Sequence, residues 1–203
     1  MKIYLATDHA GFELKESIKL FLEIEKNELK DELEKSGQVI SNIEIVDFGA
    51  YIYEETDDYP NFISVCVGAL SSDVYTGIKN NMAIIFGGSG EGEAIVADKY
   101  KGVRAGIINS ENIELVKLLR KHNNANVLSV GARFISDDFA KQSVKTFILT
   151  KFEEKDSNNK VSRHERRLEE IEDLEETIDK KIKKEELDEL KIFEEMRGVG
   201  NDN

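Results

Sequence analysis

Short apolar runs alternate with helix-length amphipathic segments from the first residue of this chain to about position 150. Runs that are apolar throughout are typical of strands buried on both faces of a sheet. Strand-like and helix-like segments that take turns along a chain predict parallel βαβ units with helices on both faces. The predicted strands are Lys2–Thr7, Ile43–Phe48, Met82–Phe86, Val103–Ile108 and Asn126–Val130.

The amphipathic segments between these strands predict helices. They are approximately Gly11–Lys35, Asn61–Ser71, Gly90–Lys99, Ser110–Lys121 and Ser136–Leu149. Together the elements predict an α/β fold, a doubly wound three-layer sandwich around a five-stranded parallel sheet of the Rossmann-like type. Ligands bind outside the carboxyl ends of the strands in such sheets, so the residues that follow each strand are candidate site residues.

The character of the chain changes near residue 150. Beyond that point the sequence is strongly charged, and apolar residues recur every three or four positions, which predicts a long amphipathic helix. The recurring residues are Leu168, Ile171, Leu174, Ile178 and Ile182. We expect an α/β domain over residues 1–150 and a C-terminal helical extension over residues 151–203 that packs on the α/β body or on a second subunit. Residues 23–38 are expected to prolong the first helix.

Composition narrows the function classes. A chain of 203 residues with 40% hydrophobic residues can bury the core of one domain and carry an appendage. Its net charge of −13 argues against a nucleic-acid binder, which needs a basic face, but allows a small anionic ligand held by a few local cations. We expect neither a membrane span nor a signal peptide. Cys66 is the one cysteine, so no internal disulfide is expected, and the predicted location is cytoplasmic.

The densest chemical signal is the segment FGGSGEGEAIVADK, Phe86–Lys99, which follows a predicted strand and opens a predicted helix. Its glycines allow backbone N–H groups to approach an anion closely. They are Gly87, Gly88, Gly90 and Gly92. Glu93 follows directly, and a carboxylate beside such amides suits proton abstraction next to a carbonyl, because the amides can hold the charge of an enediolate. The alternative interpretation of Glu93 is a first-turn acid favoured by the helix dipole.

Polar residues also gather at the ends of the first and last predicted strands. Asp8 and His9 follow the first strand, where they can face a ligand or cap the next helix. His122 and Asn123 precede the last strand and Arg133 follows it, although a histidine at a helix C-terminus is favoured in any case.

Two further features concern cations and metals. Arg163 and Arg167 lie four residues apart on one helix face, which suits bidentate capture of a phosphate, unless neighbouring glutamates pair with them. The three histidines show no spacing with cysteines or acids that indicates a metal site, so we expect no metal. Cys66 lies in an apolar helix and is interpreted as a core residue.

In their order along the chain, these motifs resemble those of type B ribose-5-phosphate isomerases. The matching stretches are TDHAGFELK, VDFGA with DDYP, GGSGEGEAIVADK, GVRAG, HNNANVLSVGAR and RHERR, and they span about residues 1–170. The related galactose-6-phosphate and allose-6-phosphate isomerases share the fold. The resemblance implies an aldose–ketose isomerase that interconverts ribose 5-phosphate and ribulose 5-phosphate through a cis-enediolate, with Glu93 as the base and with no cofactor.

The resemblance also implies roles for the matching residues. Glu93, His122 and Asp8 would be catalytic, with His122 assisting ring opening and Asp8 contacting the sugar. The other matching residues would bind the sugar or its phosphate: His9, Tyr59, Gly88, Ser89, Gly90, Gly92, Asn123, Arg133, Arg163 and Arg167. Members of this family are homodimers with shared active sites, so His122 and Arg133 would reach into the partner's pocket, and higher assemblies stay open.

One departure from part of the family bears on the base. Many members carry a cysteine base at the position of Gly87, whereas this chain resembles the branch in which a glutamate is the base. Three alternatives stay open: an isomerase of a six-carbon sugar phosphate, a non-catalytic sugar-phosphate-binding protein, and a nucleotide-binding module. For the last, Asp47 at the end of the second strand is the only matching feature.

Overall fold

A computed structural model describes residues 1–198 of the chain, with side chains through residue 185. The chain divides into two compact units, Met1–Glu153 and Glu154–Asn203. The division falls close to position 150, where the composition changes. Each unit is described by itself.

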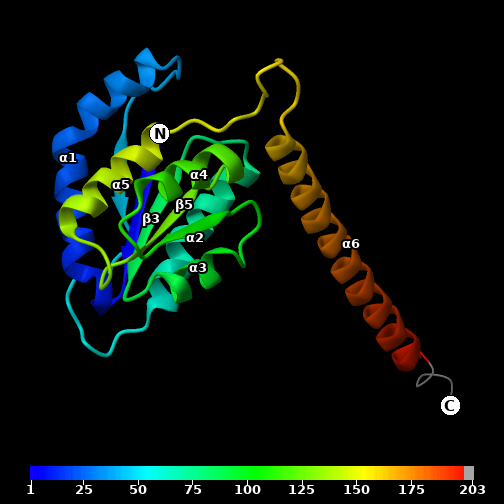
Figure 1. The fold of residues 1–203 in the computed structure, drawn as a ribbon. Coiled ribbons are helices and arrows are strands. Elements are labelled where there is room, and N and C mark those ends of the chain that lie inside the picture. The colour runs from blue at the N-terminus through cyan, green and yellow to red at the C-terminus, as the bar shows by residue number, and fades with distance from the viewer. Residues whose placement is uncertain (199–203) are drawn as a thin grey trace. The chain divides into compact units, whose positions relative to one another are not determined.

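The first unit contains a parallel sheet of five strands within the described residues, which confirms the predicted doubly wound α/β fold (Figure 1). The strands lie in the order β2-β1-β3-β5-β4, so the winding direction reverses between β1 and β3. Ligands in such sheets bind at this reversal, outside the carboxyl ends of the strands. The strands are β1 (Lys2–Thr7), β2 (Glu44–Asp47), β3 (Met82–Gly87), β4 (Ala105–Ile108) and β5 (Val127–Gly131).

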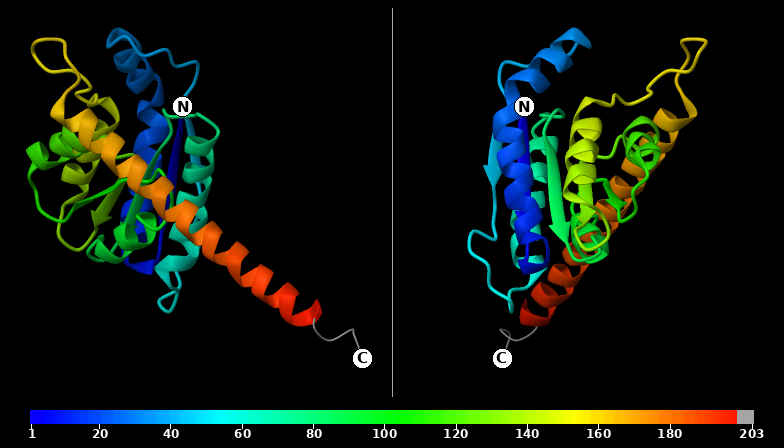
Figure 2. Two further views of the ribbon diagram at one scale, coloured as in Figure 1. Left: turned by 90° about the vertical axis from the view of Figure 1, so that its right-hand side faces the viewer. Right: turned by 60° about the vertical axis from the view of Figure 1, so that its left-hand side comes forward.

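Helices cover both faces of the sheet, and Figure 2 shows the layers from two further sides. One core lies between the sheet and the helices α1, α4 and α5, and the other lies between the sheet and α2 and α3. A short 3₁₀ turn, η1, joins β1 to α1. These helices are η1 (His9–Gly11), α1 (Phe12–Lys35), α2 (Tyr59–Tyr75), α3 (Glu91–Ala97), α4 (Ile113–Asn123) and α5 (Asp137–Leu149).

Alternation along β1 explains why the strand sequences are apolar throughout. Ile3 and Leu5 belong to the core under α1 and α5, whereas Tyr4 and Ala6 belong to the core under α2. Successive side chains of a strand point to opposite faces, so a strand covered on both faces needs apolar residues at every position.

The helix boundaries differ from the predicted ones where capping chemistry decides them. α2 begins at Tyr59, before the predicted Asn61, and carries Pro60 in its first turn, where a missing N–H costs nothing. α4 begins at Ile113, after the predicted Ser110, because the Asn112 side chain accepts a hydrogen bond from the Glu114 N–H and caps the helix.

The first helix continues through the charged segment to Lys35, as expected, and the chain then turns at Gly37, whose φ is +88°. Leu29 and Leu33 in this prolonged part are completely buried in the core under α1 and α5. Cys66 is also completely buried, in α2, in agreement with its interpretation as a core residue.

The second unit contains α6 (Arg163–Gly198), the long C-terminal helix that the apolar spacing predicts. The Ser162 hydroxyl accepts hydrogen bonds from the N–H groups of His164 and Glu165 and so caps its start. Four side chains of the apolar stripe are about half exposed: Ile171, Leu174, Ile178 and Ile182. Within the described residues, the helices are too short or too polar to cross a bilayer.

Candidate functional site

The residues that follow β1 and β3 lie next to each other at the carboxyl edge of the sheet. Thr7, the last residue of β1, pairs with Phe86 of β3, and its hydroxyl donates to the Phe86 carbonyl at 3.1 Å. Gly11 packs so tightly here that a Cβ on it would lie 2.5 Å from Cβ of Phe86. The Asp8–His9 pair and the β3–α3 turn therefore start from one rigid junction.

The segment of residues 87–92 runs from the last residue of β3 into the first turn of α3 and is called the β3–α3 turn here. It is packed closely at several of its glycines. A Cβ on Gly92 would lie 2.8 Å from the Tyr59 hydroxyl oxygen, and a Cβ on Gly88 would lie 3.2 Å from the Arg133 guanidinium. Gly90 has a φ of +80°, which favours glycine, and its carbonyl accepts a hydrogen bond from the Ser129 hydroxyl. The glycines thus bring Tyr59 and Arg133 against the turn.

The carboxylate of Glu93 lies directly against Gly87. A Cβ on Gly87 would lie 1.8 Å from Oε1 and 2.0 Å from Cδ of Glu93. Glu93 is 4% exposed, and it belongs to the first turn of α3. Burial raises the pKa of this carboxyl above its ordinary value, and the nearby charge of Asp8 raises it further.

Asp8 and His9 are each held by hydrogen bonds, but to different partners. The Asp8 carboxylate caps η1 by accepting from the Ala10 N–H at 2.9 Å. The backbone N–H and the ring Nδ1 of His9 both lie 2.8 Å from Oδ1 of Asp57, in the loop between β2 and α2. The hydrogen bond with Asp57 raises the pKa of His9, and so does the charge of Asp8, whose Oδ2 lies 4.0 Å from Nδ1.

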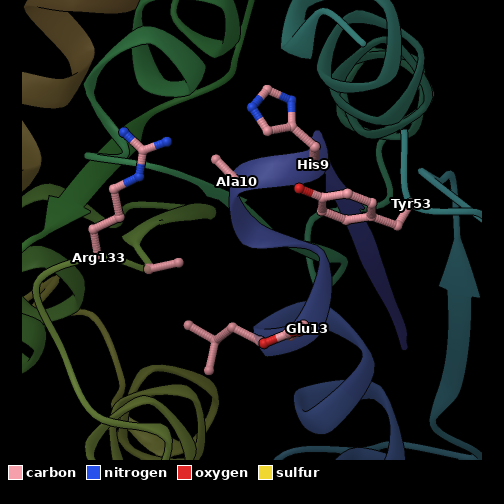
Figure 3. A pocket seen from close by; sticks show the side chains of 7 residues that line it. His9, Ala10, Glu13, Tyr53 and Arg133 are labelled. Atoms are coloured by element: carbon pink, nitrogen blue, oxygen red, sulfur yellow. The ribbon is translucent and has the colours of Figure 1, made fainter. Parts of the chain in front are cut away.

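A cavity of about 360 Å³ opens beside His9 (Figure 3). His9 and Arg133 approach it from different elements, and the ring of Tyr53 meets the His9 ring edge-on with centroids 6.4 Å apart. The volume suits a small ligand, and the guanidinium of Arg133 suits an anionic group. The lining residues are His9, Ala10, Glu13, Leu14, Tyr53, Ala132 and Arg133.

Two predicted site residues lie at the opposite edge of the sheet in the same chain. α4 ends with His122 and Asn123 just before β5 begins, so they adjoin the amino ends of the strands. Asp8 and Glu93 follow the carboxyl ends instead. One chain therefore brings together Asp8, Tyr59, Glu93 and Arg133, but not His122 and Asn123.

Arg133 lies at the cavity of its own chain, and its expected reach into a partner's pocket stays a prediction. It follows β5, the neighbour of β3, so its side chain lies over Gly88 and lines the cavity of its own chain. Ser89 and Gly90 lie in the β3–α3 turn as expected. Arg163 and Arg167 belong to the second unit, where both are exposed in the first two turns of α6.

Sequence reasoning missed the contributions of Asp57 and Tyr53. Asp57 lies 48 residues from His9 in the chain, and its position inside the DDYP motif gives no indication of its partner. Asp8, His9 and Asp57 offer possible metal-ligand atoms within 4.8 Å of one another. The 2.8 Å hydrogen bond between His9 and Asp57 accounts for this closeness without an ion.

Comparisons with known proteins show which family the chain belongs to. The family model for Ribose/Galactose Isomerase matches residues 3–171. Ribose-5-phosphate isomerase B of Mycolicibacterium paratuberculosis is 34% identical over 87% of this chain and 93% of that protein.

Solved structures give the same result. The chain is similar to ribose-5-phosphate isomerase B of Mycoplasma genitalium with bound ribulose-5-phosphate, with a TM-score of 0.64 and 28% identity over 86% of this chain and 96% of that chain. A ribose 5-phosphate isomerase of Thermotoga maritima gives a TM-score of 0.63 and 33% identity, and the match covers 85% of this chain and 97% of that chain.

Proposed function

Because this chain belongs to the ribose/galactose isomerase family, it is an aldose–ketose isomerase, and we propose that it interconverts ribose 5-phosphate and ribulose 5-phosphate. The names of its relatives and the bound ribulose-5-phosphate in the Mycoplasma genitalium structure support this substrate. The observation that carries the proposal is the buried carboxylate of Glu93, placed against a glycine turn at the β1–β3 junction.

Glu93 acts as the base in this proposal. It removes the C2 proton of the open-chain aldose, which leaves a cis-enediolate held by N–H groups of the β3–α3 turn. The same carboxyl group then returns the proton to C1, while the hydroxyl proton moves from O2 to O1. Burial supports this role, because a raised pKa makes the Glu93 carboxylate a stronger base.

The position of the Glu93 carboxylate also bears on the cysteine base of other family members. The carboxylate fills the space in which a side chain at position 87 would begin. A side chain at residue 87 and the observed Glu93 conformer therefore exclude each other. Gly87 and Glu93 together fit the glutamate-base branch.

We assign substrate binding to the groups around the turn and the cavity. His9 and Arg133 bind the phosphate, Asp8 contacts the sugar, and Tyr59 and Ser89 line the reacting end. Arg163 and Arg167 are proposed to complete the phosphate site, in line with the resemblance, and neither a cofactor nor a metal takes part.

A homodimer with shared sites completes the proposal. His122 and Asn123 lie at the edge of the sheet away from Glu93, so they can assist ring opening only in the site of another copy. The apolar stripe of α6 is proposed to pack on the partner, and the expected location is the cytoplasm. A six-carbon sugar phosphate is the alternative substrate, because the family model covers both ribose and galactose isomerases.

The test is conversion of ribose 5-phosphate by purified protein with chelator present, wild type beside Glu93→Ala. We expect turnover by the wild type and a loss of several orders of magnitude in kcat for the variant, with substrate binding retained. Allose 6-phosphate and galactose 6-phosphate are assayed in parallel. A higher kcat/KM for either of these would favour the six-carbon alternative, and binding without turnover of any of them would favour a binding protein.

Truncation after residue 160 tests the second unit. If α6 supplies phosphate ligands and dimer contacts, the truncated protein should show a raised KM and fewer subunits per particle by light scattering. An unchanged KM and an unchanged number of subunits would contradict both roles of α6.

A further inference from the structure

The orientation of the His9 ring is fixed by contacts within the protein. One oxygen of Asp57 accepts from both the backbone N–H and the ring Nδ1 of His9, each at 2.8 Å. The Asp57 side chain is 9% exposed, and its other oxygen, Oδ2, is buried with no hydrogen-bond partner among the described residues. Tyr53 packs edge-on against the same ring. Within the described residues, the hydrogen bonds of the Asp57 carboxylate are therefore those with His9.

We propose that Asp57 is a positioning residue that keeps the hydrogen of His9 on Nδ1, so that His9 receives the substrate phosphate through Nε2 and does so only as an imidazolium. The identification of the anion as a sugar phosphate rests on the proposed function. The pairing of Asp57 with His9 does not.

The chemistry of imidazole gives the reason. An ionised carboxylate only accepts hydrogen bonds, so Nδ1 beside Asp57 carries a hydrogen in the neutral and in the charged ring. In the neutral ring, Nε2 then presents a lone pair, which repels phosphate oxygens. In the charged ring, Nε2 carries a hydrogen and donates a charge-assisted bond to the phosphate. Asp57 thus couples phosphate binding to the charge of His9.

The charged groups around His9 act in the same direction. Asp8 precedes His9 in the chain and directly follows β1. Asp57 and Tyr53 come from the loop between β2 and α2. Glu13 of α1 lines the same cavity. Arg133, from the turn after β5, is the cation in the lining besides His9. Since the neighbouring acids would repel a phosphate, a positive charge on His9 is needed beside Arg133.

The direction of the pH dependence follows from the raised pKa of His9. A histidine with a raised pKa keeps its charge to a higher pH and loses it as the pH rises through that pKa. A sugar phosphate becomes a dianion above about pH 6. Binding should be strongest between these two limits, and removal of the Asp57 charge should move the upper limit to lower pH.

The experiment compares the wild type, Asp57→Asn and Asp58→Asn. For each protein, kcat and KM for ribose 5-phosphate and the inhibition constant of inorganic phosphate are measured from about pH 6 to about pH 9. For Asp57→Asn we expect KM and the inhibition constant to rise by up to about tenfold at the alkaline end of this range and by less at neutral pH, with kcat within about twofold, because a pKa lower by one unit reduces the charged fraction tenfold only well above the pKa. Asp58 is the matched control, since it is exposed and its side chain makes no capping hydrogen bond to α2.

A histidine titration by NMR separates this inference from the proposed function. The chain has 3 histidines, so His9→Gln identifies the signal of His9 directly. We expect its pKa to fall in Asp57→Asn and to be unchanged in Asp58→Asn. If no sugar phosphate is turned over but this pKa falls and inorganic phosphate binds more weakly, the proposed function fails and the inference stands.

Two results would overturn the inference. The first is a His9 titration that is the same in the wild type and in Asp57→Asn. The second is an equal further rise in KM when Asp57→Asn is added to His9→Gln, because a residue that acts through His9 has no effect once His9 is absent.

Discussion

The two segments that border the candidate site are held in place by different means. The β3–α3 turn is packed closely against the side chains of Tyr59, Glu93 and Arg133, and its glycines leave little room for side chains of their own. The β2–α2 loop, residues 48–58, is mostly exposed and is tied down by polar side chains near its two ends. Lys15 donates to the Ala50 carbonyl at 2.8 Å near one end, and Asp57 accepts from His9 at the other.

This difference separates two tasks of the site. A base needs a fixed distance to its proton, which close packing of Glu93 against Gly87 provides. Substrate discrimination needs a wall that can vary without disturbing the base. Tyr53 lies in the exposed middle of the loop and lines the cavity, so the loop can provide that wall.

The largest expected effect concerns the tether of the loop. Lys15 is completely buried and contacts Asp47 at 2.9 Å, whereas Lys19 contacts the same carboxylate with a side chain that is 37% exposed. Lys15→Met should lower the free energy of unfolding by about 3 kcal/mol, because it leaves a buried charge with poorer compensation. Lys19→Met should cost less than about 1 kcal/mol. Urea unfolding of both variants measures the difference, and equal losses would show that burial does not distinguish the two lysines.

The next effect concerns the packed turn. Gly87→Ala places a methyl group where the Glu93 carboxylate lies, so the base must move. A displacement of about 1 Å can cost on the order of 100-fold in rate, and we expect a kcat loss of that size with a folded protein. Gly68→Ala is the control, because its added Cβ would make only an ordinary contact, 3.4 Å from Tyr100. A Gly87→Ala enzyme with wild-type kcat would contradict the proposed position of the base.

The pH dependence of kcat sharpens the role of burial in the turn. Glu93 must be ionised to accept a proton, and its pKa lies above the ordinary value of 4.5. Activity should therefore fall about tenfold per pH unit below a midpoint that is higher than that of an exposed glutamate. A kcat that stays flat down to about pH 4 would exclude a glutamate with a raised pKa as the base.

The smallest effect concerns the wall of the cavity. Tyr53→Ala should enlarge the cavity and shift the ratio of kcat/KM for six-carbon over five-carbon sugar phosphates upward, by roughly tenfold or less. Ile52→Ala is the control, since Ile52 is exposed and does not line the cavity. A ratio that changes equally in both variants would assign selectivity to another segment.

The local sequence pattern was sufficient to predict most of the secondary structure. The five strands and the helices between them were predicted within a few residues, and the long C-terminal helix was predicted without its start at Arg163, because burial on one or two faces imposes a period that a short segment already displays. The order of motifs was sufficient for the family, which the comparisons confirm. The glycines followed by Glu93 also indicated the turn, since the anion-binding amides and the proposed base lie in consecutive residues.

Only the tertiary structure decided which distant residues meet. Asp57 and His9 are 48 residues apart, and the proximity of Arg133 to Gly88 depends on β5 lying beside β3 in the sheet. The separation of His122 from Glu93 in one chain depends on which end of the strands each follows. Periodicity is a property of neighbouring residues, whereas these contacts depend on strand order and on the packing of loops. A local sequence pattern therefore cannot predict the strand order or the packing of the loops.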